Sequence, residues 1–527
     1  MRKTTAILVA AVLLAAAPAF AELQNIQVGG ELRIKGNYIT NWVSSPTGLE
    51  TRIPTFFTPF RAVGDFLSGA PAFNGIGVVS PYRWDGNGNS SGFVEQRTKL
   101  NVKADFTCDV TAFIELDSYD VWGEDFRSNY ITGADSRAWT GNDVEVYQAY
   151  IEMRNMFEQP LRMRVGRQEL AFGSQWLVGP KDNGPWFPGR SFDALRLTYD
   201  TDMFSVDAWA AILAEGGITE EDEDVWFYGV YGTYKGIENM TFDAYWMWVR
   251  DARSLNDTNF IAPFEWVEDL FGLDDYDVTN LHTVGLRGAG QVGNLDFEIE
   301  GAYQFGEADQ VGFGFKPFLY GDDGAEFDAW ACTAEVGYTL DVYMQPRLWV
   351  GYAYYSGEDN RDVSFWEWIN PFDEPTASVS FNRLFSNVMY NGFFDLNNDL
   401  SNCHIFQAGV DLHPFEKLDV MADVYYYLAD EEFDSPAYVT LGGFRVPIAP
   451  ALPFWASEND NEIGITTDLV VVYHYSEDLM FLAHWCHLFT GDGLSDGNYN
   501  ARNGLVFTGG SDDEDADFFT VETRICF

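Results

Sequence analysis

Basic residues recur at spacings of two or four positions in three segments of the first 170 residues. This basic set consists of Arg33, Lys35, Arg97, Lys99, Lys103, Arg162 and Arg164. In an extended chain every second side chain points to the same face, so these groups would form one basic surface across neighbouring strands. Such a surface attracts anions and offers paired hydrogen-bond donors to carboxylates. The spacing therefore predicts a site for an anionic solute.

Carboxylates interleave with these bases and allow a second interpretation. The acidic residues on the same faces are Glu31, Glu95, Asp105, Glu115, Asp117 and Glu152. Opposite charges on adjacent strands form cross-strand pairs. In this alternative the surface is electrically balanced.

Acidic residues also occur in uninterrupted runs. Residues 220–224 are all acidic, and Asp512, Asp513, Glu514 and Asp515 precede the last alternating segment of the chain. We interpret these runs as solvated loop surface. The alternative is binding of Ca²⁺ or Mg²⁺ by the loops, since these cations prefer carboxylate oxygens, although no EF-hand spacing is present. The sequence therefore predicts no metal centre.

Motifs of catalysis are missing from the sequence. It contains no GxSxG, HExxH or Walker pattern, and its five cysteines are far apart, with no CxxC pair. His484 and His487 are three residues apart, so in a strand they point to opposite faces and cannot share one metal ion. We therefore predict a protein that is not an enzyme and uses no cofactor.

Alternation of polar and apolar residues recurs from residue 28 to the end of the chain and predicts β-strands. Connections between the alternating segments are short and long in turn, which is typical of an outer-membrane barrel with short periplasmic turns and long extracellular loops. Eighteen strands would leave an aqueous channel. The predicted strands are 28–42, 93–106, 110–122, 143–154, 161–169, 190–199, 203–214, 224–235, 240–250, 279–290, 294–306, 326–340, 344–356, 401–413, 417–430, 462–475, 479–491 and 516–527.

Composition agrees with an all-β transmembrane, antiparallel, up-and-down barrel. The 527 residues have a formal net charge of -50, which excludes nucleic acid as a partner. Aromatic residues make up 17% of the chain, too many for a disordered acidic tail. In a barrel these rings would contact lipid and form interfacial girdles, and closure would leave no unpaired strand edge in the hydrocarbon. The alternative is a water-soluble β-sandwich.

Both ends of the chain predict export to the outer membrane. Arg2 and Lys3 precede the apolar run 6–17, and a small-residue site follows at 19–21, so we expect residues 1–21 to be a cleaved signal peptide. The remaining residues, 22–527, would form a single barrel domain. The last strand ends on Phe527 and resembles the closing strand of bacterial outer-membrane barrels, which the barrel assembly machinery reads. The other expected partners are outer-membrane lipid and lipopolysaccharide.

Two blocks of sequence are similar to the alginate-export family of outer-membrane porins. The first runs from Arg164 through Gly173, Gly179 and Trp186 to Arg196, and the second includes 381–385, 390–392 and Asp395. The resemblance implies an 18-stranded barrel with a selective pore, which in the type member passes a polyuronate outward through an arginine-lined constriction. Carried onto this chain, it implies Arg167, Arg190, Asp193 and Arg196 as lumen and constriction residues. The alternative is that this Arg/Asp set is a buried network that fixes an inward-folded loop.

Taken together, these features predict a passive outer-membrane channel that conducts anionic solutes or polysaccharide through a charged lumen. One alternative is an abundant structural surface protein whose acidic loops bind divalent cations while its pore is plugged. Another is a general porin that prefers cations because its loops are acidic.

Overall fold

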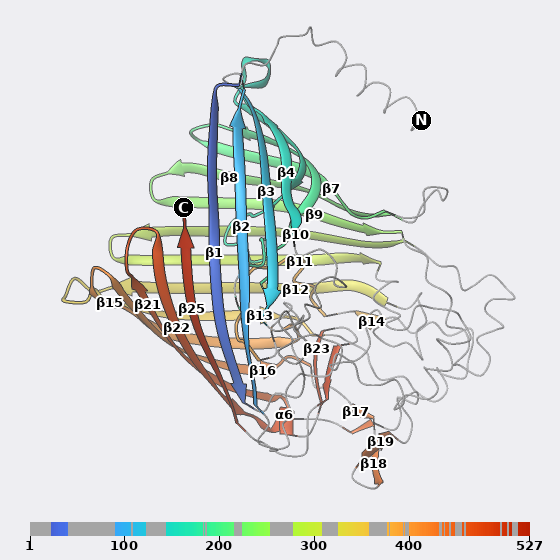
Figure 1. Cartoon of the computed structure of the whole chain (residues 1–527). Helices are drawn as coiled ribbons and strands as arrows, with labels where there is room; N and C mark the ends of the chain where they lie inside the picture. Colours follow the sequence, from blue (N-terminus) through green and yellow to red (C-terminus); the bar gives the residue numbers. More distant parts are fainter. Residues whose placement is uncertain are drawn as a thin grey trace, which may run out of the picture.

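The computed structural model places most of the described residues in one curved sheet (Figure 1). The predicted signal peptide, residues 43–89 of the first long connection, and Asp512, Asp513 and Glu514 lie outside the described residues. The structure describes residues 23–40, 90–106, 109–122, 144–215 except 183, 185 and 186, 224–252, 278–307, 325–357, 380–431 except 394 and 396–399, 460–495 and 515–527, with short pieces within 377–378, 435–457 and 498–508.

Eighteen long antiparallel strands form a closed barrel. Strand β1 pairs with β2 on one side and with the last strand, β25, on the other, and Figure 1 shows the blue β1 beside the red β25. The barrel strands are β1 (Asn25–Thr40), β2 (Ser90–Asp105), β3 (Val110–Val121), β4 (Glu145–Met153), β5 (Leu161–Gln168), β6 (Phe192–Asp200), β7 (Phe204–Ala214), β8 (Val225–Ile237), β9 (Met240–Asp251), β10 (Thr279–Val292), β11 (Leu295–Glu307), β12 (Ala325–Thr339), β13 (Arg347–Tyr355), β15 (Cys403–Phe415), β16 (Leu418–Ala429), β21 (Glu462–His474), β22 (Leu479–Thr490) and β25 (Ala516–Cys526).

Each of these strands begins and ends within three residues of its predicted position. The two-residue strand β14 (Ala377–Ser378) adds a parallel pair to β12. The remaining elements are the 3-10 turn η3 (Met156–Glu158), the short helix α6 (Asp492–Ser495), and the strands β17 (Ser435–Pro436), β18 (Tyr438–Leu441), β19 (Phe444–Pro447), β20 (Ala456–Ser457), β23 (Asn498–Arg502) and β24 (Leu505–Thr508).

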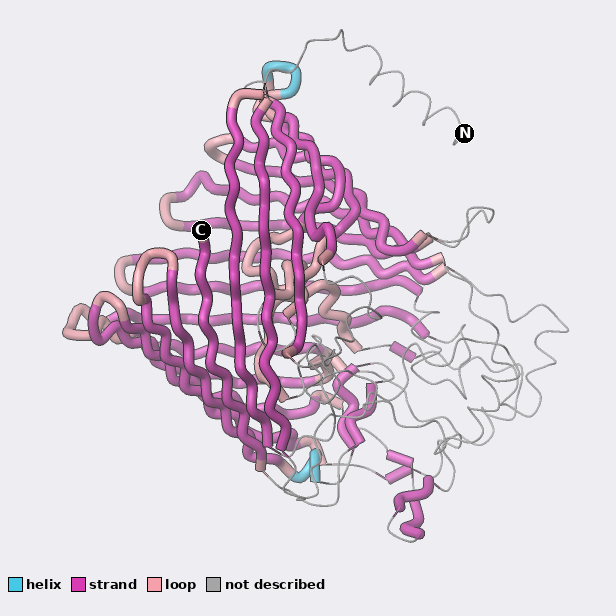
Figure 2. The backbone as a smooth tube through the Cα atoms, viewed as in Figure 1, coloured by secondary structure: helices cyan, strands magenta, loops and turns pink. Residues whose placement is uncertain are grey.

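Connections differ between the two ends of the barrel, as predicted. At one end, here called the short-turn rim, successive strands are joined by as few as two residues, at 238–239, 293–294 and 416–417. Figure 2 shows these turns in pink along one side of the barrel. At the other end, here called the long-loop rim, connections such as 41–89 and 356–402 are much longer. No helix among the described residues is long and apolar enough to span a membrane.

Side chains alternate between the two faces of the sheet. Outward positions are apolar and exposed, as at Ile299 and Val350, whose exposed fractions are 57% and 62%. Glu300, next to Ile299, and Ala353, three positions after Val350, face inward and are buried. A barrel with an apolar exterior and a polar interior suits lipid outside and water inside.

The hydrophobic core lies within the barrel rather than between two layers. Buried inward side chains from most of the strands pack against two connections that enter the barrel from the long-loop rim. We call residues 169–191, between β5 and β6, the first crossing segment. We call residues 380–402, before β15, the second crossing segment.

Candidate functional site

The two crossing segments interlock inside the barrel. Val178 of the first segment forms a parallel bridge with Phe385 of the second. The amide of Gly179 donates to the carbonyl of Phe385 at 2.9 Å, and the amide of Phe385 donates to the carbonyl of Leu177 at 2.9 Å. The two segments are about 200 residues apart in sequence, and they contain the two blocks that carry the family resemblance. These blocks therefore meet in space.

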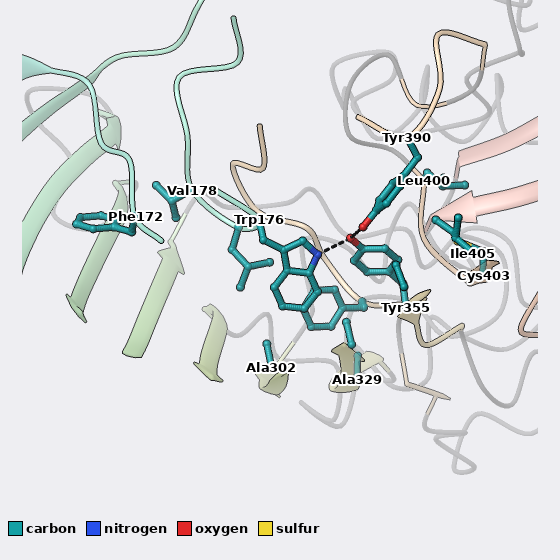
Figure 3. Packing of buried hydrophobic residues seen from close by; sticks show 14 of the residues in the cluster. Phe172, Trp176, Val178, Ala302, Ala329, Tyr355, Tyr390, Leu400, Cys403 and Ile405 are labelled. Atoms are coloured by element: carbon teal, nitrogen blue, oxygen red, sulfur yellow. Dashed lines mark hydrogen bonds between the residues drawn. The ribbon is translucent and has the colours of Figure 1, made fainter. Parts of the chain in front are cut away.

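A chain of aromatic side chains fixes the crossing segments to the barrel wall (Figure 3). The indole N–H of Trp176 donates to the hydroxyl of Tyr355 on β13 at 2.6 Å. That hydroxyl in turn shares a 2.8 Å hydrogen bond with the hydroxyl of Tyr390 in the second segment. Phe381 stacks against Trp176, with ring centroids 6.1 Å apart. The indole nitrogen of Trp176 and the hydroxyls of Tyr355 and Tyr390 thus all have hydrogen-bond partners, as buried polar atoms in a stable core require.

An enclosed ion pair braces the second crossing segment. Arg383 contacts Asp395 at 2.6 Å, and the side chains are 1% and 0% exposed. Asp395 also accepts hydrogen bonds from the amides of Tyr390 and Leu400, at 2.8 and 3.3 Å. The family resemblance included Asp395 but did not indicate that it pairs with Arg383.

Two of the predicted basic residues attach the first crossing segment to β1. Arg33 makes a bidentate pair with Glu522 at 2.6 and 2.9 Å, and it donates to the carbonyl of Asp182. Lys35 donates to the carbonyl of Gly184. Both cations lie 4.2 Å from the ring centre of Phe187. Both bases face inward as predicted, but they hold a loop and are buried.

Arg97 and Lys99 on β2 surround Tyr147. The Arg97 guanidinium is 2.7 Å from Asp117, and both side chains are almost completely buried. Lys99 lies 4.3 Å from the ring centre of Tyr147 and about equally far from Glu115 and Glu169, at 3.6 and 3.5 Å. These contacts agree with the alternative in which cross-strand ion pairs balance the charge of this surface.

The remaining inward bases lie on β2, β5 and β6 and are less buried. Each contacts a polar side chain of the same strand or of an adjacent strand. Lys103 is 3.5 Å from Asp105, Arg162 donates to Thr198 at 3.3 Å, Arg164 is 2.6 Å from Glu152, and Arg196 is 2.8 Å from Asp207. The structure thus brings the inward-facing bases onto one wall, formed by β1 to β6, and intersperses carboxylates among them.

Arg190 is the exception on this wall. It lies at the end of the first crossing segment, with its guanidinium 5.4 Å from the ring centre of Phe385. Its Nη1 atom is buried and has no hydrogen-bond partner, and no carboxylate among the described residues pairs with it. Burial lowers the pKa of Arg190 to about 10. A buried guanidinium without a counter-charge is costly, and an anion placed beside it would remove that cost.

The expectation that Arg167 and Asp193 line the lumen is wrong. They pair with each other across β5 and β6 at 2.9 Å, with exposed fractions of 45% and 55%. The register between these strands is regular, so both share a face with the exposed outward residues Val165 and Leu195. No bulge intervenes to turn them inward. Arg196 follows directly after the outward Leu195, so it faces the interior.

Sequence reasoning missed an acidic wall across the lumen. The strands from β9 to β22 carry many inward carboxylates but, among the inward residues described, only two arginines, Arg287 and Arg347. Asp423 and Asp468 even lie directly opposite each other in register. The sequence could have predicted this wall, because these residues alternate with outward apolar residues in their strands and acidic residues are in excess after residue 197. The carboxylates are Asp243, Asp296, Glu298, Glu300, Glu335, Asp411, Asp419, Asp423 and Asp468.

Histidine and cysteine side chains form no cluster suited to a metal ion within the described residues. His484 contacts the inward Asp468 at 2.6 Å, whereas His487 contacts Asp517 at 2.9 Å on the other face. Cys332, Cys403, Cys486 and Cys526 are free thiols. Asp515 is the one described residue of the acidic run considered for loop cation binding.

Residues 86–507 match the family model described as alginate export. The chain belongs to the alginate export family. It is an outer-membrane β-barrel channel, in contact with membrane lipid and with the solutes that enter its lumen. The match spans both crossing segments, so the interlocked core lies within the region that the family model matches.

Solved porin structures resemble the chain at low sequence identity. OccAB1 of Acinetobacter baumannii has a TM-score of 0.49 and 10% identity, covering 95% of this chain and 96% of its own. OccK11 (OpdR) of Pseudomonas aeruginosa has a TM-score of 0.47 and 9% identity, with the same coverage. An anion-selective porin from Comamonas acidovorans has a TM-score of 0.40 and 9% identity, covering 95% and 99%. No curated protein sequence matches the chain significantly.

Proposed function

We propose that this alginate-export-family channel passes carboxylated solutes by diffusion along the wall formed by β1 to β6, and that Arg190 recognises their carboxylates. The observation that carries the proposal is the buried Arg190 guanidinium without a carboxylate partner among the described residues. The other inward bases on this wall each contact a carboxylate or a hydroxyl, so among the described residues Arg190 is the one without such a partner. The proposal includes no chemical step and no cofactor.

The geometry around Arg190 supports a carboxylate rather than a neutral ligand. The Tyr147 hydroxyl accepts from the Arg190 amide at 3.1 Å and lies 3.1 Å from the Arg190 carbonyl, and its shorter contact is with Glu169, at 2.7 Å. Arg97 and Lys99 stack on the same Tyr147 ring. A positive group fixed on a wall of low dielectric attracts anions more strongly than a mobile one in water. Planar guanidinium also matches a carboxylate in bidentate geometry.

Export and assembly belong to the same proposal. Residues 1–21 would be removed as a signal peptide, and residues 22–527 would fold as one barrel with the help of the barrel assembly machinery. The outward pair of Arg167 and Asp193 lies near the long-loop rim, where β5 ends and β6 begins. It would contact lipopolysaccharide head groups.

A second candidate is a porin that prefers cations. The acidic wall from β9 to β22 supports it, because the carboxylates there outnumber the arginines and Asp423 and Asp468 both keep a buried oxygen without a hydrogen-bond partner. A third candidate is a structural surface protein with a closed pore. The observation in its favour is that the crossing segments contact β1, β11, β13 and β16 and so extend across the lumen.

Reversal potentials in a planar bilayer test the three candidates. The folded mature protein is placed in a tenfold KCl gradient, and galacturonate oligomers are then added. We expect anion preference and block by the oligomers, with block weakened by roughly tenfold in Arg190→Gln because a charge-assisted hydrogen bond is lost. Arg167→Gln is the matched control, since this arginine faces outward and should leave both quantities unchanged.

Each other outcome contradicts the proposal. Cation preference of the wild-type channel would support the second candidate. A correctly folded barrel that conducts no current would support the third. Equal block of wild type and Arg190→Gln would remove Arg190 as the recognition group.

A further inference from the structure

A cavity lies on the acidic wall at the short-turn rim. Its volume is about 280 Å³. With about 30 Å³ for each water molecule in the liquid, it has room for about nine waters, which corresponds to a small polyol or one sugar ring. The lining residues are Thr339, Gln345, Arg347, Asp411, Leu412, His413, Asp419 and Met421.

The ends of two neighbouring hairpins form the cavity. One hairpin joins β12 to β13 through the turn 340–346, which contributes Gln345, and the other joins β15 to β16 through the turn 416–417. The other lining residues lie on these four strands, close to the turns. The first turn is held in a defined shape, because Met344 and Gln345 have left-handed φ angles of 72° and 43° and the Met344 carbonyl accepts from the amide of His413 at 2.8 Å. The cavity is therefore a built feature of the rim.

Carboxylates exceed cations around the cavity. Arg347 contacts Asp296, Glu335 and Asp411 at 2.5, 2.6 and 3.2 Å, so three carboxylates surround one guanidinium. Asp419 accepts one hydrogen bond from each of two imidazoles, at 2.7 Å from His413 and 2.9 Å from His474. An anionic ligand would add repulsion here, and a cationic one would lower the free energy.

The lining combines what a sugar ring requires. Sugar hydroxyls both donate and accept hydrogen bonds, and Asp, Gln, Arg and His side chains supply both functions. Leu412 and Met421 supply apolar surface for the C–H face of a ring, and small-molecule sites combine such surface with a few placed polar groups. We propose that this cavity binds a single sugar ring from the periplasmic side and favours an amino sugar over a neutral or acidic one.

The cavity is separate from the proposed carboxylate site. In the order of pairing around the barrel, β13, β15 and β16 lie across the lumen from β4 to β6, where Arg190 is attached. The inference thus goes beyond the proposed function and does not depend on it. A ligand that carries both an amine and a carboxylate would find opposite charges on the two walls.

Saturation-transfer NMR on the folded barrel in detergent micelles tests this site whether or not the pore conducts. Three probes share one ring and differ in charge at near-neutral pH: glucosamine, glucose and glucuronate. We expect dissociation constants to rise in that order. If glucuronate binds as tightly as glucosamine, or if none of the three binds, the proposal is overturned.

Substitutions of lining residues test whether the sugar binds in this cavity. Asp411→Asn and Asp419→Asn keep the side-chain shape and remove a charge, and each should weaken glucosamine binding by roughly tenfold with little change for glucose. Asp202→Asn, in the 201–203 turn between β6 and β7, is the matched control. Met421→Trp fills the cavity without touching its ion pairs and should abolish binding of all three probes.

Heat-dependent gel mobility shows whether each variant barrel is folded. If an aspartate variant does not fold, Met421→Trp alone decides the matter. Unchanged glucosamine binding in a folded Met421→Trp barrel would contradict the proposal.

Discussion

Arg383 and Asp395 form an ion pair of 2.6 Å that is enclosed within the barrel, although both residues belong to a connection rather than to a strand. Arg383 also reaches the carbonyl of Leu400 at 3.2 Å, so the pair ties the two ends of the second crossing segment together. A loop that is anchored by an enclosed charge pair is a fixed part of the core. We therefore expect the passage of solute to depend on how firmly this segment is held.

Replacing one partner should release the second crossing segment. Asp395→Asn leaves the Arg383 guanidinium buried without a counter-charge, which costs about 3–5 kcal/mol. We expect the barrel to remain folded, the segment to become cleavable by protease and the single-channel conductance to rise. Limited proteolysis with mass spectrometry, followed by bilayer recording, measures both effects.

The double variant Arg383→Met with Asp395→Leu is the control for this prediction. It removes both charges and keeps similar volume, so it should protect the segment far better than Asp395→Asn does. Equal protease resistance of wild type and Asp395→Asn would show that the pair does not hold the segment.

Gly166 on β5 should tolerate no side chain. Its φ angle is +123°, and a Cβ there would lie 2.3 Å from the carbonyl oxygen of Ala149 on β4. We expect Gly166→Ala to cost roughly 1–3 kcal/mol in the free energy of unfolding, from the backbone strain alone. Urea unfolding in lipid vesicles, followed by tryptophan fluorescence, gives this value.

Gly232 on β8 provides the matched comparison. A Cβ there would have the carbonyl oxygen of Ala244 as its nearest contact, at 3.7 Å, and its φ angle is ordinary for a strand. Gly232→Ala should leave the unfolding free energy nearly unchanged. Equal destabilisation by the two substitutions would contradict the local explanation.

Arg167→Ala should leave ion selectivity unchanged, although the family signature contains this residue. Arg167 and Asp193 are about half exposed on the outer face. An exposed pair of this kind contributes about 0–1 kcal/mol to stability, so the loss should also be small. A shift of the reversal potential in Arg167→Ala would show that the residue reaches the conduction path.

Tyr355→Phe should loosen both crossing segments at once. The Tyr355 hydroxyl accepts from Trp176 and shares a hydrogen bond with Tyr390, so its removal leaves buried polar groups without a partner. We expect a loss of about 1–3 kcal/mol in the free energy of unfolding. Thermal unfolding measured by gel mobility checks this value.

Tyr352→Phe is the control for the aromatic chain. The Tyr352 hydroxyl bonds to His404 on the outer face, at 2.8 Å, away from the crossing segments. This variant should keep the segments resistant to protease. Equal protease sensitivity of the two variants would argue against a specific role for Tyr355.

The barrel was predictable because its signal is local. Lipid outside and water inside impose a two-residue period on every strand, and short turns separate strands at regular positions. Residues such as Arg33, Lys99 and Arg164 could therefore be placed on the inner face from parity alone. The acidic wall had the same parity, but its carboxylates were attributed to the outer loops.

Parity also explains the error at Arg167 and Asp193. The family motif suggested lumen positions for both. Asp193 and Arg196 are three positions apart, so they could share the inner face only if a bulge lay between them. The strands pair in regular register, and parity alone would have placed the two residues outside. A resemblance identifies which residues recur in a family, whereas the strand period decides which way each one points.

By itself the sequence determined the number of strands, their limits and the face of most charged residues, because each of these depends on neighbours within about ten positions. Closure of the barrel could be expected because lipid leaves no partner for an open strand edge. Only the tertiary structure decided what fills the lumen. The pairing of Val178 with Phe385 and of Trp176 with Tyr355 joins residues about 200 positions apart. Such contacts follow from the path of irregular connections, which have no period, and from the packing of side chains across a closed barrel.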